Sequence, residues 1–403
     1  MRPARRPPRL AVALLAAAAL VAIAAVAHAA RAGRGAARAP PAGAAVVFSR
    51  GDGGYSCVKI PSVTRLAGGA LLALGEGRRG SCADDAPTDV VARRSSDGGR
   101  SWGALRVAVG GGAAAQPASS TWGNAAPVVL PSGALLLPLC RNNAEVWLSR
   151  SDDGGASFAP PVRLEGVVDP AWRWVGLGPP AGLLLRSGRV LVPLYRSAHR
   201  LDGTVTAGAA MLSDDGGASW RLGAAVGGAE HWVNEGQAAE LASGEVLLNA
   251  RGAGVFRLQA ASRDGGESFG AVSDVPSLGA PVDGCEGSLL ALPPGACGGA
   301  GGAQRVLYSG PSGPSVLRRD MRLHASDDGG ATYSELATID GGAVGYSSLA
   351  LLGANATGAA PRAGLLYERS DEWRLVFEPD AILFVPLGPD VLCARPRPAA
   401  AAA

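Results

Sequence analysis

The stretch Ser95-Ser96-Asp97-Gly98-Gly99-Arg100-Ser101-Trp102 decides the fold, because the chain repeats its pattern four more times. Every copy reads Ser-x-Asp-x-Gly-x-x-aromatic, and the others occupy residues 151–158, 213–220, 262–269 and 326–333. Their aspartates lie 56, 62, 49 and 64 residues apart along the chain. Such a long, regular period indicates the blades of a propeller. The sequence therefore predicts an all-β, six-bladed β-propeller, in which strands from the two ends of the chain close the sixth blade.

The chemistry of this repeat predicts a turn between two strands. The aspartate can accept hydrogen bonds from backbone N–H groups of its own turn, and the glycine after it permits a positive φ. The final aromatic residue is expected to pack on the sheet below. Because the same aspartate recurs in every copy, we interpret these aspartates as structural and not catalytic. Apolar stretches near the repeats fit strands, at residues 70–74, 134–139, 189–194 and 245–249.

Length and composition favour one large catalytic domain. The 403 residues include 59 glycines and 29 prolines, and only 18% are charged, which is typical of a turn-rich β protein. We assign residues 45–393 to the propeller, 31–44 to a low-complexity linker and 394–403 to a Pro/Ala tail. The net charge of +3 comes mostly from arginines in the first 38 residues, so no nucleic-acid-binding surface is expected.

The first 30 residues have the features of a targeting segment. Four arginines precede an uninterrupted apolar stretch at residues 10–26, and Ala27-His28-Ala29 fits a signal-peptidase site. The segment is predicted to be a signal peptide, which gives the protein a secreted or lumenal location. The apolar stretch is also about long enough to span a bilayer, so an uncleaved signal anchor of a type II membrane protein is the alternative.

The six cysteines fit that compartment, since an even number in a secreted chain permits three disulfides. A bridge between Cys57 and Cys82 would fix loops near the candidate site, and Cys285 and Cys297 are the nearest other pair. The sequence does not choose among the connectivities. Metal binding is the weaker interpretation, because the chain has no Cys-x-x-Cys motif and its four histidines are scattered.

Together with the repeats, further motifs resemble the sialidase (exo-α-neuraminidase) superfamily. Val58-Lys59-Ile60-Pro61 is similar to the Tyr/Phe-Arg-Ile-Pro signature of that family, and Glu76-Gly77-Arg78 follows it. Other motifs occur in the family's order, namely Asn-Glu-Gly-Gln at 234–237, Leu-Asn-Ala-Arg at 248–251, Arg-Arg-Asp-Met at 318–321, Gly-Tyr-Ser-Ser-Leu at 345–349 and Leu-Tyr-Glu at 366–368. The resemblance covers residues 45–390 and implies a glycoside hydrolase that needs no metal or organic cofactor.

The resemblance also indicates which residues would bind an acidic sugar. A sialic acid carries a carboxylate on its anomeric carbon, and arginine side chains bind carboxylates bidentately. Arg251 and Arg318 match two arginines of the family, but Lys59 occupies the place of the third and lacks the planar fork. Glu368 matches the glutamate that orients this first cation. Two further positions match residues near the sugar's hydroxyl substituents, Arg78 and Asn124.

Sialidases use a tyrosine nucleophile. The anomeric carbon already bears a carboxylate, which would repel an anionic nucleophile, whereas a tyrosine is neutral until it is activated. Tyr346 matches this tyrosine, and Glu235 matches the carboxylate that takes its proton. The general acid is expected on the loop after residue 78, where counting from the flanking arginines favours Asp84, with Asp85 in reserve. This acid would protonate the glycosidic oxygen and then activate water as a base.

These residues predict a retaining exo-α-sialidase that hydrolyses terminal sialic acids of glycoproteins, glycolipids or oligosaccharides through a tyrosyl-enzyme intermediate. The alternatives are a non-catalytic propeller that binds an acidic glycan, a trans-sialidase, and a glycosidase for a related acidic sugar. The presence of Tyr346, Glu235 and Asp84 favours an enzyme, because binding alone requires no nucleophile with its base. Contact with a membrane is expected only if the N-terminal segment is retained as an anchor.

Overall fold

The computed structural model describes residues 38–111, 120–197, 206–228, 230–282, 284–298, 304–353, 360–371 and 377–395. The predicted signal segment lies outside these residues, as do parts of the predicted linker and tail. Within the described ranges, no helix is both long enough and apolar enough to cross a membrane. Helical structure is limited there to the short 3-10 helix η2 (Asp52–Gly54) and the α-helix α2 (Pro389–Leu392), so the all-β prediction is confirmed.

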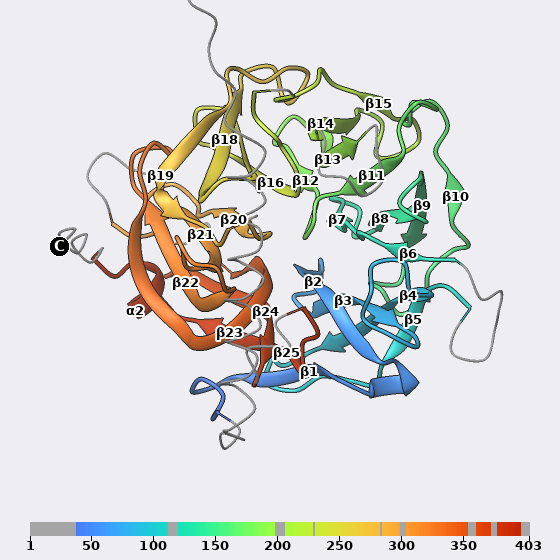
Figure 1. Cartoon of the computed structure of the whole chain (residues 1–403), viewed down its shortest axis with the longest axis horizontal. Coiled ribbons are helices and arrows are strands. Elements are labelled where there is room, and N and C mark those ends of the chain that lie inside the picture. Colours follow the sequence, from blue (N-terminus) through green and yellow to red (C-terminus); the bar gives the residue numbers. More distant parts are fainter. Residues whose placement is uncertain are drawn as a thin grey trace, which may run out of the picture.

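Sheets of antiparallel strands surround a common centre (Figure 1). The first sheet contains β2 (Cys57–Arg65), β3 (Leu71–Arg78), β4 (Thr88–Ser95) and β5 (Arg106–Val109). The second contains β6 (Trp122–Gly123), β7 (Val128–Val129), β8 (Leu135–Arg141), β9 (Glu145–Ser151) and β10 (Val162–Arg163). The third contains β11 (Trp174–Leu177), β12 (Leu183–Leu184), β13 (Val190–Ser197), β14 (Thr206–Ser213) and β15 (Arg221–Leu222). The fourth contains β16 (Gly236–Glu240), β17 (Val246–Ala250), β18 (Phe256–Ser262) and β19 (Ser273–Gly279).

A seven-stranded sheet completes the ring and joins the two ends of the described chain. It contains β20 (Ser288–Ala291), β21 (Val306–Pro311), β22 (Arg319–Ser326), β23 (Ser334–Gly353), β24 (Arg362–Ser370), β25 (Ala381–Leu387) and β1 (Ala45–Ser49). The 20-residue strand β23 pairs with β22 along its first half and with β24 along its second. Hydrogen bonding therefore gives five sheets among the described residues, and the count of six blades stays a prediction.

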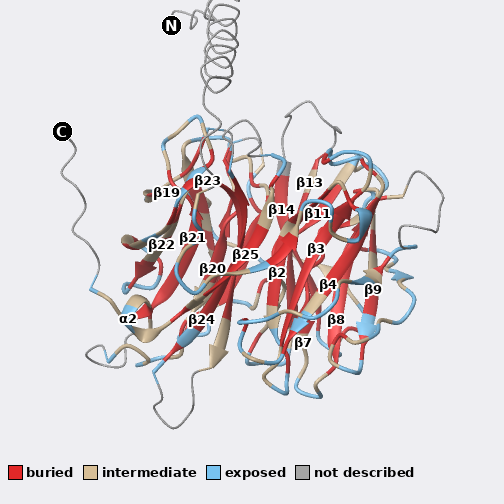
Figure 2. Ribbon diagram, turned by 90° about the horizontal axis from the view of Figure 1, so that it is seen from below, coloured by how far each residue is buried: buried red, intermediate tan, exposed pale blue. Residues whose placement is uncertain are grey.

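The predicted strands are almost entirely buried. All four are present as β3, β8, β13 and β17, and each begins one residue later than expected. Every residue of β3 is buried, because neighbouring sheets cover both of its faces, and so its first four residues, 71–74, are a continuous apolar run without alternation. Leu72 and Leu74 of β3, for example, pack with Leu135 and Leu137 of the next sheet. Figure 2 shows these buried strands between exposed turns.

The five repeats form the turns that their chemistry predicts. In the third copy, Asp215 accepts hydrogen bonds from the Ser213 hydroxyl at 2.8 Å and from the Ser219 backbone N–H at 2.9 Å. The hydroxyl of Ser219 also donates to Asp215, and this bond is the largest of several that lower the pKa of the aspartate to about 2. The aromatic residues of the repeats are partly buried, and Tyr333 is fully buried. In each copy the aspartate accepts the backbone N–H of the residue four positions later, which is the turn role that the sequence predicts.

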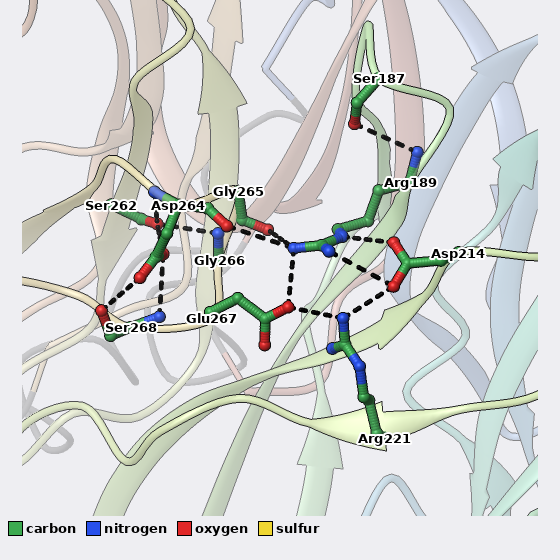
Figure 3. A network of polar contacts seen from close by, with 10 residues as sticks. All are labelled: Ser187, Arg189, Asp214, Arg221, Ser262, Asp264, Gly265, Gly266, Glu267 and Ser268. Carbon is green, nitrogen blue, oxygen red and sulfur yellow. Dashed lines mark hydrogen bonds and ion pairs between the residues drawn. The ribbon is translucent and has the colours of Figure 1, made fainter.

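Each turn also contacts the preceding sheet, and this contact explains the second glycine of the repeat. A Cβ atom on Gly217 would lie 2.7 Å from the Leu136 side chain, and one on Gly155 would lie 3.0 Å from Leu72. Both glycines also have positive φ. Polar side chains link the sheets at the fourth repeat, where Arg189 pairs with Asp214 at 2.5 Å and with Glu267 at 3.1 Å (Figure 3).

A pocket of about 380 Å³ lies between the sheets at the centre of the ring. Its lining comes from the innermost strands β2, β7, β12, β16, β20 and β23. It is lined by the end of β2 at Val63 and Arg65, whereas the candidate residue Lys59 lies near the other end of that strand. The pocket is therefore separate from the candidate site.

Two disulfides are present among the described residues, and they show the connectivity that the sequence leaves open. Cys57 and Cys82 are bridged, whereas Cys297 pairs with Cys393 and not with Cys285. The loop that carries Cys297 packs against the end of α2, which brings the C-terminal cysteine to it. Cys285 stays buried at the candidate site, and with Cys140 it is a free thiol, so the three disulfides that the cysteine count permits do not form.

Candidate active site

The candidate residues lie at one end of the ring because neighbouring strands are antiparallel. The start of one strand then lies beside the end of the next, as Lys59 in β2 lies opposite Glu76 in β3. Glu235 immediately precedes β16 and Arg251 immediately follows β17, the strand paired with it. Strands from separate sheets thus bring residues that are far apart in the sequence to the same end of the ring.

Tyr346, Glu235 and Arg251 form the centre of the site. The Tyr346 hydroxyl donates a hydrogen bond of 2.5 Å to Glu235 Oε1. Arg251 Nη1 donates to the other carboxylate oxygen of Glu235 at 2.9 Å and to the Tyr346 hydroxyl at 3.3 Å. Burial and then the charge of Glu235 raise the pKa of Tyr346 well above its usual value, although the two nearby arginines oppose this. The free protein therefore holds a neutral phenol beside a carboxylate that can take its proton.

Two other cations lie near this centre with few partners. Arg318 is buried, stacks over the Tyr346 ring at 5.4 Å and donates one long hydrogen bond of 3.4 Å to the Gly284 carbonyl. Lys59 is only 6% exposed. Among the described residues, its ammonium group has neither a hydrogen bond nor an ion pair. Lys59 and Arg318 could therefore bind an anion together with Arg251.

Glu368 acts on the backbone as well as on Lys59. Its charge favours the ammonium form of Lys59, and its oxygens accept hydrogen bonds from the backbone N–H groups of Ile60 at 2.9 Å and Tyr346 at 3.1 Å. Ile60 has a φ of 54°, which is unusual for a β-branched residue and follows Lys59 at an irregular point of β2. Glu368 thus fixes the backbone that carries both Lys59 and Tyr346, and its charge acts on Lys59 only through space.

Arg78 and Asp84 form a second group beside Lys59. Arg78 donates to Asp84 at 2.7 Å and to Glu76 at 2.7 Å, and Glu76 also accepts the Asn124 backbone N–H at 2.8 Å. The Asp84 side chain is 70% exposed. Partial desolvation opposes its ionisation, but Arg78 and Lys59 outweigh that effect and lower the pKa of Asp84.

The geometry also separates Asp84 from the neighbouring aspartates. Asp85 is exposed and has no hydrogen bond or ion pair within the described part of the chain. Asp89 is buried and accepts a hydrogen bond of 2.7 Å from the Tyr55 hydroxyl, with Arg79 as a further partner. Asp84 is therefore the aspartate of this loop that faces the candidate cations.

Sequence reasoning gave no role to Glu76 or Glu286 and did not find Phe377. Glu76 lies two residues from Arg78 on the same face of β3, and this spacing is the signal that could have identified it. Glu286 is a charged residue just before the mostly apolar strand β20, and a charged residue so close to a buried strand is also a usable signal. Phe377 lies under Arg318, with 4.7 Å between the guanidinium carbon and the ring centre, and no sequence pattern predicts that contact.

Comparisons with known proteins give a consistent result. The family described as BNR repeat-like domain matches residues 69–356. The sialidase of Micromonospora viridifaciens is 29% identical over 304 residues, and the match covers 69% of this chain but 46% of that protein. The exo-alpha-sialidase of Aspergillus fumigatus is 28% identical, with coverage of 69% and 70%. A solved structure, the Hadza microbial sialidase Hz136, is 25% identical with a TM-score of 0.74, covering 87% of this chain and 69% of that one. The chain thus spans less than half the length of the Micromonospora relative.

Proposed function

Since the chain belongs to the BNR repeat-like family within the sialidase superfamily, we propose that it is a retaining exo-α-sialidase. Its substrates are glycoproteins, glycolipids or oligosaccharides that end in sialic acid. The observation that carries the proposal is the 2.5 Å hydrogen bond between Tyr346 and Glu235, next to Arg251 and Arg318. A nucleophile with its base and a group of cations is the combination that hydrolysis of an acidic sugar requires.

In the first step, the Tyr346 oxygen attacks the anomeric carbon and its proton passes to Glu235. Asp84 gives a proton to the glycosidic oxygen as the bond to the leaving sugar breaks. In the second step, Asp84 takes a proton from water, the water attacks the anomeric carbon, and the Tyr346 oxygen leaves and regains its proton from Glu235. Two displacements at the same carbon retain its configuration.

Asp84 must carry a proton before the first step, but its pKa in the free protein is lowered. In the free protein the charges of Arg78 and Lys59 favour the ionised form of Asp84, which cannot act as an acid. A bound sialic acid would exclude water from the carboxyl group and add the negative charge of its own carboxylate near those cations. Both effects raise the pKa of Asp84, so substrate binding itself prepares the general acid.

The test is release of sugar from a fluorogenic α-sialoside by the purified protein, with Tyr346→Phe as the control. Proton NMR of the reaction should show the α-anomer as the first product. A 2,3-difluorinated sialic acid should accumulate as a covalent adduct, because the fluorine next to the anomeric carbon slows its hydrolysis. Peptide mass spectrometry should find this adduct on Tyr346. Initial release of the β-anomer, or an adduct on another residue, would refute the proposed mechanism.

A related acidic sugar is a second candidate substrate, because Lys59 stands where a planar guanidinium would orient the carboxylate. Turnover of the sialoside should therefore be compared with that of its analogue in which a hydroxyl replaces the N-acetyl group. Adding lactose as an acceptor distinguishes a trans-sialidase, which would form a sialylated trisaccharide. Binding of both sugars without release of either would favour the non-catalytic propeller.

A further inference from the structure

Glu286 lies beneath the centre of the candidate site and has no role in the proposed mechanism. It precedes β20 and is 1% exposed. Its Oε2 accepts a hydrogen bond of 2.7 Å from the backbone N–H of Ser347, the residue after Tyr346. The pairing of β23 with β24 is irregular between Val344 and Ser347, so neighbouring strands alone do not fix this segment.

Two buried carboxyl groups therefore hold consecutive backbone N–H groups of the irregular segment. Glu368 of β24 accepts the N–H of Tyr346, and Glu286 accepts that of Ser347. The Ser347 hydroxyl is bound in turn to Ser309 of β21, at 2.9 Å from its side-chain oxygen. The direction in which the Tyr346 ring points is thus set by side chains from three other segments of the chain.

Glu286 differs from Glu368 in that only one of its two carboxyl oxygens has a hydrogen-bond partner in the described part of the chain. Glu286 Oε1 is buried and has no hydrogen-bond partner among the described residues. The nearby charged groups are Glu235, Glu368 and Arg257, but Arg257 donates its hydrogen bonds to Asn249 and to the Cys285 carbonyl. Tyr308 and the Cys285 thiol also lie near Glu286. Burial raises the pKa of both groups, so neither supplies a charge that could stabilise an ionised Glu286. An ionised Glu286 would add a third negative charge beside two other buried carboxylates without a cation bound to it.

We propose that Glu286 is a positioning residue that works as a neutral carboxylic acid and fixes the direction of Tyr346 through the backbone of Ser347. Burial raises the pKa of Glu286 well above its usual value, and Glu235 and Glu368 act in the same direction, while the bond from Ser347 and the charge of Arg257 oppose it. This inference rests on the proposed function, because positioning Tyr346 matters only if Tyr346 is the nucleophile.

The neutral form predicts a particular dependence of stability on pH. A carboxyl group with a raised pKa binds its proton more tightly in the folded than in the unfolded protein. Its contribution to stability is fully present below its unfolded pKa of about 4.3, and it is lost as the pH rises towards the raised folded value. Glu286→Gln keeps the shape and the neutral state but cannot ionise. The melting temperature of this variant should therefore exceed that of the wild type by an amount that grows as the pH rises.

Activity measurements test the positioning role. Glu286→Gln should keep kcat within about threefold of the wild type at neutral pH. It should also keep that kcat at alkaline pH, where ionised Glu286 in the wild type would hinder loss of the Tyr346 proton. Glu286→Ala should lower kcat about ten- to hundredfold with little change in KM, because a slightly displaced nucleophile affects the transition state most. A matched control is Asp340→Asn, since Asp340 is a buried carboxyl group on β23, the strand that carries Tyr346, but pairs with Arg38 at 2.6 Å, and its loss should lower the melting temperature.

Parallel melting curves of Glu286→Gln and wild type across the pH range would show that the group is not a neutral acid and would overturn the proposal. Equal loss of kcat in the Gln and Ala variants would do the same, because the charge would then be required. Wild-type kcat in Glu286→Ala would rule out positioning. If the wild type releases no sialic acid, the proposed function fails on that result, whereas the melting curves separately decide the protonation state of Glu286.

Discussion

Replacement of Lys59 tests how the site binds a carboxylate. Lys59 is the only lysine in the 403 residues, although arginine is abundant. Its side chain is buried, and Glu368, the carboxylate whose charge acts on it most strongly, already accepts two backbone hydrogen bonds. The carboxylate of a bound sugar would therefore provide the partner that Lys59 lacks in the free protein.

The size of the effect follows from the lost interaction. A hydrogen bond between charged groups contributes about 1.5–3 kcal/mol, and the sugar carboxylate is bound throughout the reaction. Lys59→Ala should therefore lower kcat/KM about ten- to hundredfold, which corresponds to about 1.4 kcal/mol or more of transition-state stabilisation. Lys59→Arg should bind a sialic acid as well as or better than the wild type, because the planar fork binds a carboxylate bidentately.

The pH dependence of kcat/KM should differ between the wild type, with its Lys59 ammonium group, and the Lys59→Arg variant, with its guanidinium group. Burial lowers the pKa of Lys59, and the charge of Glu368 offsets this only in part. The wild type should lose kcat/KM as the pH rises through this lowered pKa, since the neutral amine cannot bind a carboxylate. Lys59→Arg should not show this loss, because a guanidinium stays charged. A bound sialic acid analogue should raise the pKa of Lys59, because its carboxylate stabilises the ammonium form.

The single lysine permits a direct measurement. Reductive methylation with ¹³C-formaldehyde labels the Lys59 amine and the N-terminal amine, and the Lys59→Arg variant identifies which NMR signal belongs to Lys59. Titration of that signal with and without the analogue gives both pKa values. An unshifted pKa in the free protein, no change on binding, or wild-type kinetics in Lys59→Ala would refute the reasoning. Binding would then depend on the two arginines alone.

Asp84→Asn should lose most activity on sialosides with poor leaving groups but keep far more on an activated aryl sialoside, whose leaving oxygen needs little protonation. Equal losses in kcat/KM on the two substrates would assign the acid to another residue. Asp215→Asn should lower the melting temperature by a few degrees at neutral pH, because it weakens the acceptor of the Ser219 hydrogen bonds. The pKa of Asp215 is lowered to about 2, so this stabilisation is present above its unfolded value and should disappear as the pH falls from about 4 to about 2. Cys82→Ser breaks the bridge to Cys57, which closes a loop with a sequence separation of 25. By loop entropy it should destabilise the protein by about 3 kcal/mol, seen as a lower midpoint in urea, and an unchanged midpoint would contradict this.

Much of the local structure is determined by the sequence itself. The hydrogen bonds of each repeat join residues at most four positions apart, such as Asp215 and Ser219, so any chain segment with this pattern can form the same turn. The repeat period and the strands at 70–74, 134–139, 189–194 and 245–249 followed from the same kind of local signal. The motifs with which Tyr346 and Glu235 were selected are also short and continuous, so sequence reasoning could name those residues before any contact was known.

The contacts between the named residues depend on the closed ring. Tyr346 and Glu235 are 111 residues apart, and their hydrogen bond depends on how separate sheets pack. The sequence did not show that Glu368 binds the backbone of Ile60 and Tyr346, nor that Cys297 pairs with Cys393. It also could not assign Glu286 to the buried side of the Tyr346 segment. Local patterns fix turns and strands through short-range hydrogen bonds and alternation, whereas burial, charge neighbours and disulfide partners arise only when distant strands are packed together.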